Sequence, residues 1–410
     1  MEPKGFSTKI IHSHYLKKDS HNALHMPIYS NAAFEFDNAE HMEQAFLGRR
    51  PDHLYSRISN PTVENFEQRI QAITGALSVT ALSSGMAAIS NVFFAILEAG
   101  DNIITSKHLF GNSFSLLNST LRSFGVESKF CDLTDPEDIV KNIDTKTRAI
   151  FFETITNPQL EVVDIHQLSL IAEKYHLLLI ADSTVTPFNI FKAKVFGVNI
   201  EVISSTKIIS GGATSIGGVI VDYGNFKWEK IPKLESFANK FGPYAFNAKL
   251  RKEIFRNLGA CLSPYHAYLQ SVGMETLDLR YKKAALNCMT VAEFLQQHNR
   301  LVSVNFPGLK DSAFYEISKK QFGELPGAIL TFNLKSKEAC FDFLNRLTII
   351  RRATNLFDNK TLIMHPASTI FCEFSNEARA DMGIPDTLIR LSLGIEDVED
   401  LIEDINIALQ

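Results

Sequence analysis

Between residues 61 and 255, short apolar runs alternate with segments of helical length. Residues 103–104, 149–152 and 177–181 are apolar runs, and residues 61–74 have the pattern of a helix. Short apolar strands separated by helices are typical of a mostly parallel sheet, because the crossover helices cover both faces of such a sheet. The alternation therefore predicts an α/β domain.

The remaining segments predict an arm and a second, smaller domain. Residues 1–60 show no sustained period, as expected of an extended N-terminal arm that packs against a neighbouring subunit. A helical pattern over 265–298 is followed by a strand at 328–334 and an amphipathic helix at 398–409. We therefore divide the chain into an arm (1–60), a large domain (61–262) and a C-terminal α+β domain (263–410).

Composition and charge exclude several classes of function. The 410 residues carry a formal charge of −5, and a pI near 6.2 gives no basic surface for nucleic acid. The N-terminus is polar, and no apolar run approaches the length of a membrane span. These features predict a cytoplasmic protein of enzyme size that binds neither nucleic acid nor membrane.

Neither disulfides nor a metal site is expected. The cysteines are odd in number, widely separated and without a C-x-x-C pair, which predicts reduced thiols; they are Cys131, Cys261, Cys288, Cys340 and Cys372. No carboxylate or cysteine completes a metal-ligand set with the histidines near the N-terminus, which are His12, His14, His21 and His25. We expect these histidines to be structural or solvated.

Lys207 is the main candidate for chemistry. It ends the run Ser204-Ser205-Thr206-Lys207 and precedes a glycine-rich stretch at 211–218. A carbonyl cofactor that carries a phosphate needs an amine to form a Schiff base, and it needs hydroxyls and amides to hold the anion. The run predicts such a site; a solvent-exposed lysine before a flexible loop is the alternative.

Two other segments suit the same kind of cofactor. Residues 83–89 lead from an apolar run into a helix, and small residues at a helix start present free N–H groups to an anion. An ordinary helix cap by Ser84 is the alternative. Asp182 ends an apolar run, where it is either a loop cap or the negative charge that the ring nitrogen of a pyridoxal cofactor requires.

These polar residues are predicted to meet. Glu153, Asp182 and the 204–207 run each follow an apolar run. Ligands of parallel sheets bind beyond the carboxyl ends of the strands, so we expect the three to converge on one edge of the sheet. The spacing of 25 residues from Asp182 to Lys207 allows one crossover helix, which places the two on nearby strands.

Five segments together resemble the Cys/Met-metabolism family of pyridoxal-phosphate enzymes. They are Asp182, the Ser-x-Thr-Lys run ending at Lys207, the Ser84-Gly85-Met86 turn, Tyr55-Ser56-Arg57-Ile58-Ser59-Asn60-Pro61-Thr62 and Leu388-Ile389-Arg390-Leu391-Ser392-Leu393-Gly394-Ile395-Glu396-Asp397. The resemblance spans nearly the whole chain. It implies the aspartate aminotransferase-like fold of type I PLP-dependent transferases, pyridoxal 5'-phosphate as cofactor, and a homo-oligomer of at least two subunits, with a tetramer expected.

The resemblance also implies roles around the cofactor. Lys207 is expected to be the Schiff-base lysine and the proton shuttle, and Asp182 the partner of the pyridine nitrogen. The phosphate is expected to be held by Ser84, Gly85, Met86, Ser204 and Thr206. Tyr55 and Arg57 would reach the phosphate of a neighbouring subunit; on its own, Arg57 would pass as a surface cation.

Further roles concern the substrate. The resemblance implies that Asn157 lies near the phenolic oxygen of the cofactor and that Arg390 binds the substrate α-carboxylate as a bidentate fork. Asn355 is expected to contact the substrate as well. Without the resemblance, Arg390 would be interpreted as a helix-flanking salt-bridge residue.

Two departures from the family pattern bear on the reaction. Phe110 stands where a tyrosine usually stacks on the cofactor ring, which keeps the stacking but removes a catalytic proton donor. Acetate leaves unaided, whereas a basic methanethiolate gains more from an acid, so Phe110 favours an activated ester substrate. Ser183 follows Asp182 where asparagine is usual, and we expect only a small change in hydrogen bonding from it.

The expected reaction is γ-replacement on O-acetyl-L-homoserine by sulfide or a small thiol, which gives homocysteine or methionine and acetate. Residues 212–222, 353–358 and 365–369 are most similar to O-acetylhomoserine sulfhydrylases. The alternatives are γ-elimination from methionine, a cystathionine γ-synthase activity, and a PLP-binding protein without turnover. The intact Lys207, Asp182 and Arg390 argue against the last of these.

Overall fold

A computed structural model describes residues 5–12 and 19–410 of the chain. His14, one of the histidines named above, lies outside the described residues, as does part of the predicted arm. Among the helices of the described residues, none is both long enough and apolar enough to cross a membrane.

A seven-stranded sheet forms the larger part of the molecule. Its order is β1-β7-β6-β5-β4-β2-β3, and neighbouring strands are parallel except at β7, which is antiparallel to both β1 and β6. Its strands are β1 (Ser78–Leu82), β2 (Asn102–Thr105), β3 (Glu127–Phe130), β4 (Thr147–Glu153), β5 (Leu178–Asp182), β6 (Ile200–Ile203) and β7 (Gly218–Asp222). The mostly parallel sheet predicted from the apolar runs is confirmed.

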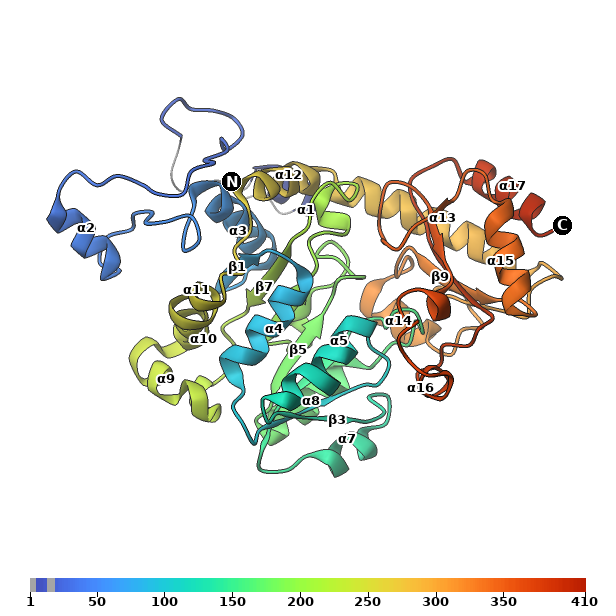
Figure 1. Ribbon diagram of the computed structural model, residues 1–410, viewed down its shortest axis with the longest axis horizontal. Coiled ribbons are helices and arrows are strands. Elements are labelled where there is room, and N and C mark those ends of the chain that lie inside the picture. The colour runs from blue at the N-terminus through green and yellow to red at the C-terminus, as the bar shows by residue number, and fades with distance from the viewer. Residues whose placement is uncertain (1–4, 13–18) are drawn as a thin grey trace.

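Helices cover both faces of this sheet (Figure 1). Along β5, Leu179 and Ala181 join the buried cluster under α3 and α8, whereas Leu178 and Ile180 join the cluster under α4. Burial on both faces explains why the strand is a continuous apolar run. The helices around this sheet are α3 (Pro61–Thr74), α4 (Gly85–Ile96), α5 (Gly111–Ser115), α6 (Leu121–Ser123), α7 (Pro136–Asn142), α8 (Ile165–Tyr175), α9 (Glu235–Phe241), α10 (Ala245–Lys249) and α11 (Phe255–Leu258).

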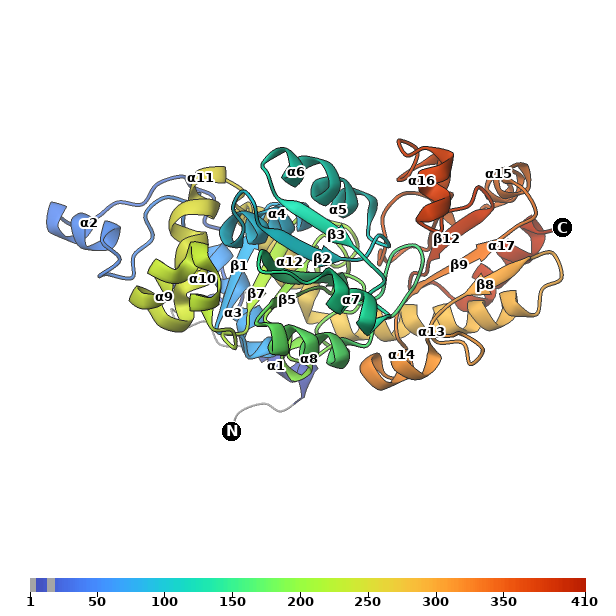
Figure 2. The same cartoon turned by 90° about the horizontal axis from the view of Figure 1, so that it is seen from below.

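A five-stranded sheet lies toward the C-terminal end of the molecule (Figure 2). Its order is β10-β11-β12-β9-β8, with strands β8 (Ser303–Asn305), β9 (Ile329–Asn333), β10 (Arg351–Arg352), β11 (Leu362–Met364) and β12 (Leu388–Ser392). The helices of this region are α13 (Leu277–Gln296), α14 (Tyr315–Phe322), α15 (Lys337–Arg346), α16 (Asn376–Asp381) and α17 (Val398–Ala408); α12 (Pro264–Glu275) precedes them and packs against α3 beside the large sheet. The predicted boundaries of the three parts, at residues 60/61 and 262/263, stay predictions.

Three segments differ from the sequence prediction. The arm contains two helices, α1 (Phe6–His12) and α2 (Ala39–Phe46), and α2 lies far from both sheets in Figure 1. The connection from β5 to β6 contains only a short 3₁₀ turn (Ala193–Phe196) instead of a crossover helix, and it ends at Gly197 in a left-handed conformation. The predicted helix over 265–298 is broken at Thr276, where φ is −105° and ψ is 9°.

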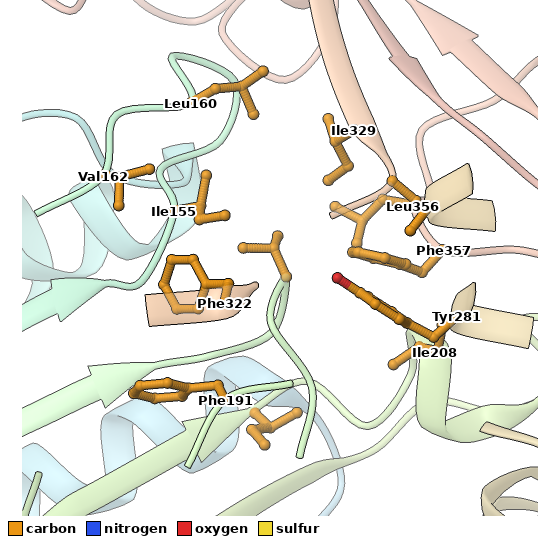
Figure 3. Close-up of a cluster of buried hydrophobic side chains, with 14 of the residues drawn as sticks. Ile155, Leu160, Val162, Phe191, Ile208, Tyr281, Phe322, Ile329, Leu356 and Phe357 are labelled. Atoms are coloured by element: carbon orange, nitrogen blue, oxygen red, sulfur yellow. The ribbon is translucent and has the colours of Figure 1, made fainter. Parts of the chain in front are cut away.

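Apolar side chains join the two sheets into one buried cluster (Figure 3). Ile155 follows β4, Ile329 comes from β9, and the ring of Tyr281 on α13 stacks on Phe357 with centroids 6.2 Å apart and an interplanar angle of 20°. Phe357 has a φ of +52°, which is uncommon for a bulky side chain. This packing fixes the segment that carries Asn355, two residues before Phe357.

Candidate active site

Polar residues meet at the edge of the large sheet where its parallel strands end. Glu153 and Asp182 are the last residues of β4 and β5, and they are register partners on these neighbouring strands. Because cross-strand partners lie on the same face, the two carboxyl groups share one side of the sheet. Ser204 to Lys207 follow β6, the next strand. The structure thus brings together the residues that were predicted to converge.

Lys207 reaches from the large sheet to the segment before β11. Its Nζ donates a hydrogen bond of 2.6 Å to Oδ1 of Asn355. Burial lowers the pKa of the Lys207 amine to about 8, and the positive charge of Arg390 acts in the same direction. A much larger fraction of this amine is therefore uncharged at neutral pH than for an ordinary lysine.

Arg390 is a buried arginine on β12 whose partners are neutral oxygens. Its Nη1 donates to Oδ1 of Asn157 at 3.1 Å, and its Nη2 donates to the carbonyl oxygens of Thr354 at 3.3 Å and Asn355 at 3.0 Å. Its Nε is buried and has no hydrogen-bond acceptor within the part of the chain that the structure describes. A buried guanidinium without a carboxylate partner suits an anionic ligand. The interpretation as a helix-flanking salt-bridge residue does not fit this geometry.

The Ser84-Gly85-Met86 turn begins α4 at the same edge. Ser84 caps the helix, since its Oγ accepts from the N–H of Ala87 at 3.0 Å. Both interpretations of Ser84 are therefore compatible, because the cap uses only one of the N–H groups that a helix start leaves free. A Cβ on Gly85 would lie 2.7 Å from Cβ of Ser204, and one on Gly218 would lie 2.0 Å from the carbonyl oxygen of Ser84. Glycine thus allows this turn, the Ser204 segment and the start of β7 to approach closely.

Hydroxyl groups connect the same segments. Oγ1 of Thr206 donates to the carbonyl oxygen of Gly217 at 3.1 Å and accepts from its N–H at 3.0 Å. Thr184 donates both its N–H and its Oγ1 to Oδ1 of Asp182, at 2.9 and 2.6 Å, and the same Oγ1 accepts from the N–H of Ser204 at 2.9 Å. Burial raises the pKa of Asp182, while the bonds from Thr184 oppose that rise.

Glu153 accepts hydrogen bonds from two loops of the site, although sequence reasoning assigned no role to this residue. Its Oε1 accepts from the N–H of Phe110 at 2.6 Å, and its Oε2 accepts from the N–H of Asn157 at 3.3 Å. Its position at the end of an apolar run was the only sequence signal. Thr184 was missed as well, although a hydroxyl two residues after a strand-end aspartate is a recognisable turn pattern.

Tyr55 and Arg57 lie on the arm, where Arg57 contacts α11. The guanidinium of Arg57 is 5.6 Å from the centroid of the Tyr55 ring, and its Nη1 donates to the carbonyl oxygen of Arg256 at 2.6 Å. Both residues are exposed beside α11. This placement does not test their predicted contact with the phosphate of another subunit.

The arrangement fits pyridoxal phosphate. Gly85 lies so close to Ser204 that there is no room for a Cβ on residue 85. This suits the close approach of backbone N–H groups to a phosphate. Asp182 has one oxygen engaged by Thr184 and the other available to a ring nitrogen. The unpartnered Nε of Arg390 and the buried amine of Lys207 provide sites for a carboxylate and a carbonyl carbon.

Curated relatives of this sequence are similar along its whole length. An O-acetyl-L-homoserine sulfhydrylase from Corynebacterium glutamicum is 34% identical, with 98% of this chain and 96% of the relative covered. An L-methionine gamma-lyase from Fusobacterium nucleatum is 35% identical, with 100% of this chain and 99% of the relative covered.

Solved structures agree with these relatives. A putative O-acetylhomoserine (thiol)-lyase from Campylobacter jejuni, which carries a pyridoxyl-lysine phosphate at its position 205, superposes with a TM-score of 0.95 at 32% identity and covers 99% of this chain and 100% of its own. O-Acetylhomoserine sulfhydrylase from Wolinella succinogenes is 47% identical with a TM-score of 0.78, over 86% of this chain and 97% of its own. The predicted type I fold is confirmed.

The family model for Cys/Met metabolism PLP-dependent enzymes matches residues 7–410. This match covers both sheets, the Lys207 segment and the Arg390 strand. The chain therefore belongs to the Cys/Met metabolism family of PLP-dependent enzymes.

Proposed function

We propose that this enzyme transfers the aminocarboxypropyl group of O-acetyl-L-homoserine to sulfide or a small thiol. The Cγ–O bond of the substrate breaks and a Cγ–S bond forms, which releases acetate and gives homocysteine or methionine. The similarity to O-acetylhomoserine sulfhydrylases at 34% and 47% identity supports this reaction. Pyridoxal phosphate, once bound, supplies the electron sink that stabilises negative charge on the substrate carbons.

The observation that carries the proposal is one chain of hydrogen bonds. Nζ of Lys207 donates to the side chain of Asn355, whose carbonyl oxygen accepts from Arg390, and Arg390 in turn donates to the side chain of Asn157. The acceptor on Asn355 for Arg390 is its backbone carbonyl oxygen. In our proposal, Arg390 binds the α-carboxylate and so holds the α-carbon near Lys207. The amine of Lys207, with its pKa of about 8, then removes the α-proton and moves protons at the β-carbon and γ-carbon.

Phe110 supports an acetate leaving group. Its ring has no ionisable proton to give, and it lies at the start of α5 with its N–H held by Glu153. A weakly basic acetate needs no acid at this position, whereas a thiolate leaving group does. In the proposed cofactor position, the Phe110 ring provides stacking alone.

Steady-state turnover of the PLP-loaded enzyme with O-acetyl-L-homoserine tests the proposal. Homocysteine and α-ketobutyrate are measured in parallel, with and without sulfide. We expect homocysteine that depends on sulfide, with little keto acid. Keto acid formed regardless of sulfide would contradict both the replacement reaction and the argument from Phe110.

Methionine γ-elimination is the second candidate, because the L-methionine gamma-lyase from Fusobacterium nucleatum is 35% identical over the whole chain. Methionine and cysteine are therefore included in the assay, as a lyase substrate and as the nucleophile of a cystathionine γ-synthase. Release of α-ketobutyrate from methionine would favour the lyase, and cystathionine from O-acetyl-L-homoserine and cysteine would favour the synthase. Failure to turn over any γ-substituted amino acid would favour a PLP-binding protein without turnover.

A further inference from the structure

Glu153 connects two loops that come from different strands. Phe110 follows β2, Asn157 follows β4, and their backbone N–H groups both point at the carboxyl group of Glu153. Only 6% of Glu153 is exposed, so water cannot replace either contact. Phe110 and Asn157 are also the two residues that the proposed cofactor site places against the ring and near the phenolic oxygen.

We propose that Glu153 is a positioning residue of the cofactor site, whose two carboxyl oxygens hold the backbone of Phe110 and Asn157 beside Asp182. This inference rests on the proposed cofactor contacts of Phe110 and Asn157. Without Glu153, two buried N–H groups would lose their acceptor, and each loss costs about 1–3 kcal/mol unless the loop moves. Movement of the Phe110 loop would take its ring away from the cofactor.

The surroundings of Glu153 make its two hydrogen bonds important. Burial, together with the charge of Asp182 on the neighbouring strand, raises the pKa of Glu153 well above its usual range, and the N–H groups of Phe110 and Asn157 oppose that rise. Arg390 donates to the side chain of Asn157 and not to Glu153. The role of Glu153 therefore depends on the two backbone N–H groups that its oxygens accept from.

Glu201 offers a matched control. It is fully buried on β6, and its carboxyl group accepts from the hydroxyls of Ser183 and Tyr223. Its register partner on β5 is Ala181, so Glu201 lies on the face of the sheet opposite to Asp182. Glu201 therefore has the burial of Glu153 without its contacts to Phe110 and Asn157.

The test measures the affinity of the apoenzyme for pyridoxal phosphate in Glu153→Met, Glu153→Gln and Glu201→Gln. Methionine keeps the volume of the side chain and removes both oxygens, and we expect the Kd to rise at least about tenfold. Glutamine has one acceptor oxygen instead of two and keeps only one of the two contacts, so the Kd should rise by less than in Glu153→Met. Glu201→Gln should leave the Kd unchanged.

A spectrum provides a second measurement. In Glu153→Met, the pH midpoint of the absorption change of the bound cofactor should move by at least about half a unit, because Asn157 is no longer held near the phenolic oxygen. The midpoint should move less in Glu153→Gln, whose single oxygen still accepts from one of the two N–H groups. A role confined to folding would change the Tm of the apoenzyme without moving this midpoint.

Three results would overturn the inference. A Kd in Glu153→Met equal to that of the parent would exclude the positioning role, and a Kd in Glu153→Gln as weak as in Glu153→Met would contradict the role of the acceptor oxygens. If Glu153→Met does not fold, amide exchange of the parent apoenzyme decides, and fast exchange at Phe110 and Asn157 would contradict the contacts. No amino-acid substrate is present in these measurements, so they fail or succeed independently of the proposed replacement reaction.

Discussion

Lys207 shows how a reactive side chain affects the stability of the folded chain. Its amine has a pKa of about 8, below the usual lysine pKa of 10.5, because burial disfavours the charged form. The unfolded chain therefore binds more protons than the folded chain between pH 8 and 10.5, and stability rises with pH across that window. Below pH 8 the folded chain bears the full cost of the buried charge, on the order of 3 kcal/mol.

Replacing this amine is predicted to stabilise the apoenzyme. Lys207→Met should raise the Tm at pH 7 by a few degrees, and the gain should shrink as the pH approaches 10. Thermal unfolding of the apo forms across this pH range measures the effect, with the exposed Lys227→Met as control. A gain that stays constant with pH would show that the buried charge is not its cause.

Candidate site residues could be proposed from the sequence where the signal was local. Lys207, Asp182 and Ser84 stood out because each lies at the end of an apolar run or beside hydroxyls and glycines. Glu153 gave no comparable signal, since its importance comes from N–H groups on two different loops. Arg390 bonds to Asn157, 233 residues away, and only the family resemblance could relate the two.

At the scale of elements, local composition predicted the buried strands but not the connections. Apolar runs coincide with β2, β4 and β5, because strands covered on both faces have little choice of residue. The arm was predicted to be extended, and α2 was missed, because a helix of eight residues makes little more than two turns and gives too short a pattern. The break at Thr276 was also missed, since the residues on both sides of it favour a helix.

Gly218, at the start of β7, gives a prediction for the close contact between this strand and the turn that begins α4. Gly218→Ala would place a methyl group against the carbonyl oxygen of Ser84, so the α4 turn must shift. We expect a loss of stability of about 2 kcal/mol or more and a weaker affinity for pyridoxal phosphate. Chemical unfolding and cofactor titration measure the two effects.

Gly327 provides the control for this substitution. It also lies inside the protein, but a Cβ there has no atom within 4 Å. Gly327→Ala should be neutral or stabilising by up to about 1 kcal/mol. If Gly218→Ala changed stability and cofactor affinity no more than Gly327→Ala, the close approach at Ser84 would not be needed for the fold or for cofactor binding.

At the scale of the whole molecule, the arm places Tyr55 and Arg57 beside α11, where both are exposed. In the predicted oligomer they contact the cofactor phosphate of another subunit. A site would then need residues of two chains, and one chain alone would have none complete.

Mixing two inactive variants tests this arrangement. Arg57→Ala and Lys207→Ala should each have little activity. After reassembly from equal amounts of the two, about half of the dimers are mixed and one of the two sites in each mixed dimer is intact, so roughly a quarter of the parent activity should return. Activity is measured after mixing, dissociation and reassembly, with each variant carried alone through the same steps. No recovery in mixed dimers would argue against a shared site.

The two sheets are also separated along the chain in the order in which the ribosome makes it. The seven-stranded sheet is complete at Asp222, whereas Arg390 lies on β12, close to the C-terminus. Since domains generally fold as they are synthesised, the nascent chain can form the Gly85 turn and expose Asp182 and Lys207 long before the strand with Arg390 exists. In the proposed mechanism, this partial chain would still lack the residue that binds the substrate carboxylate, and catalysis would begin only after the last strands had been synthesised.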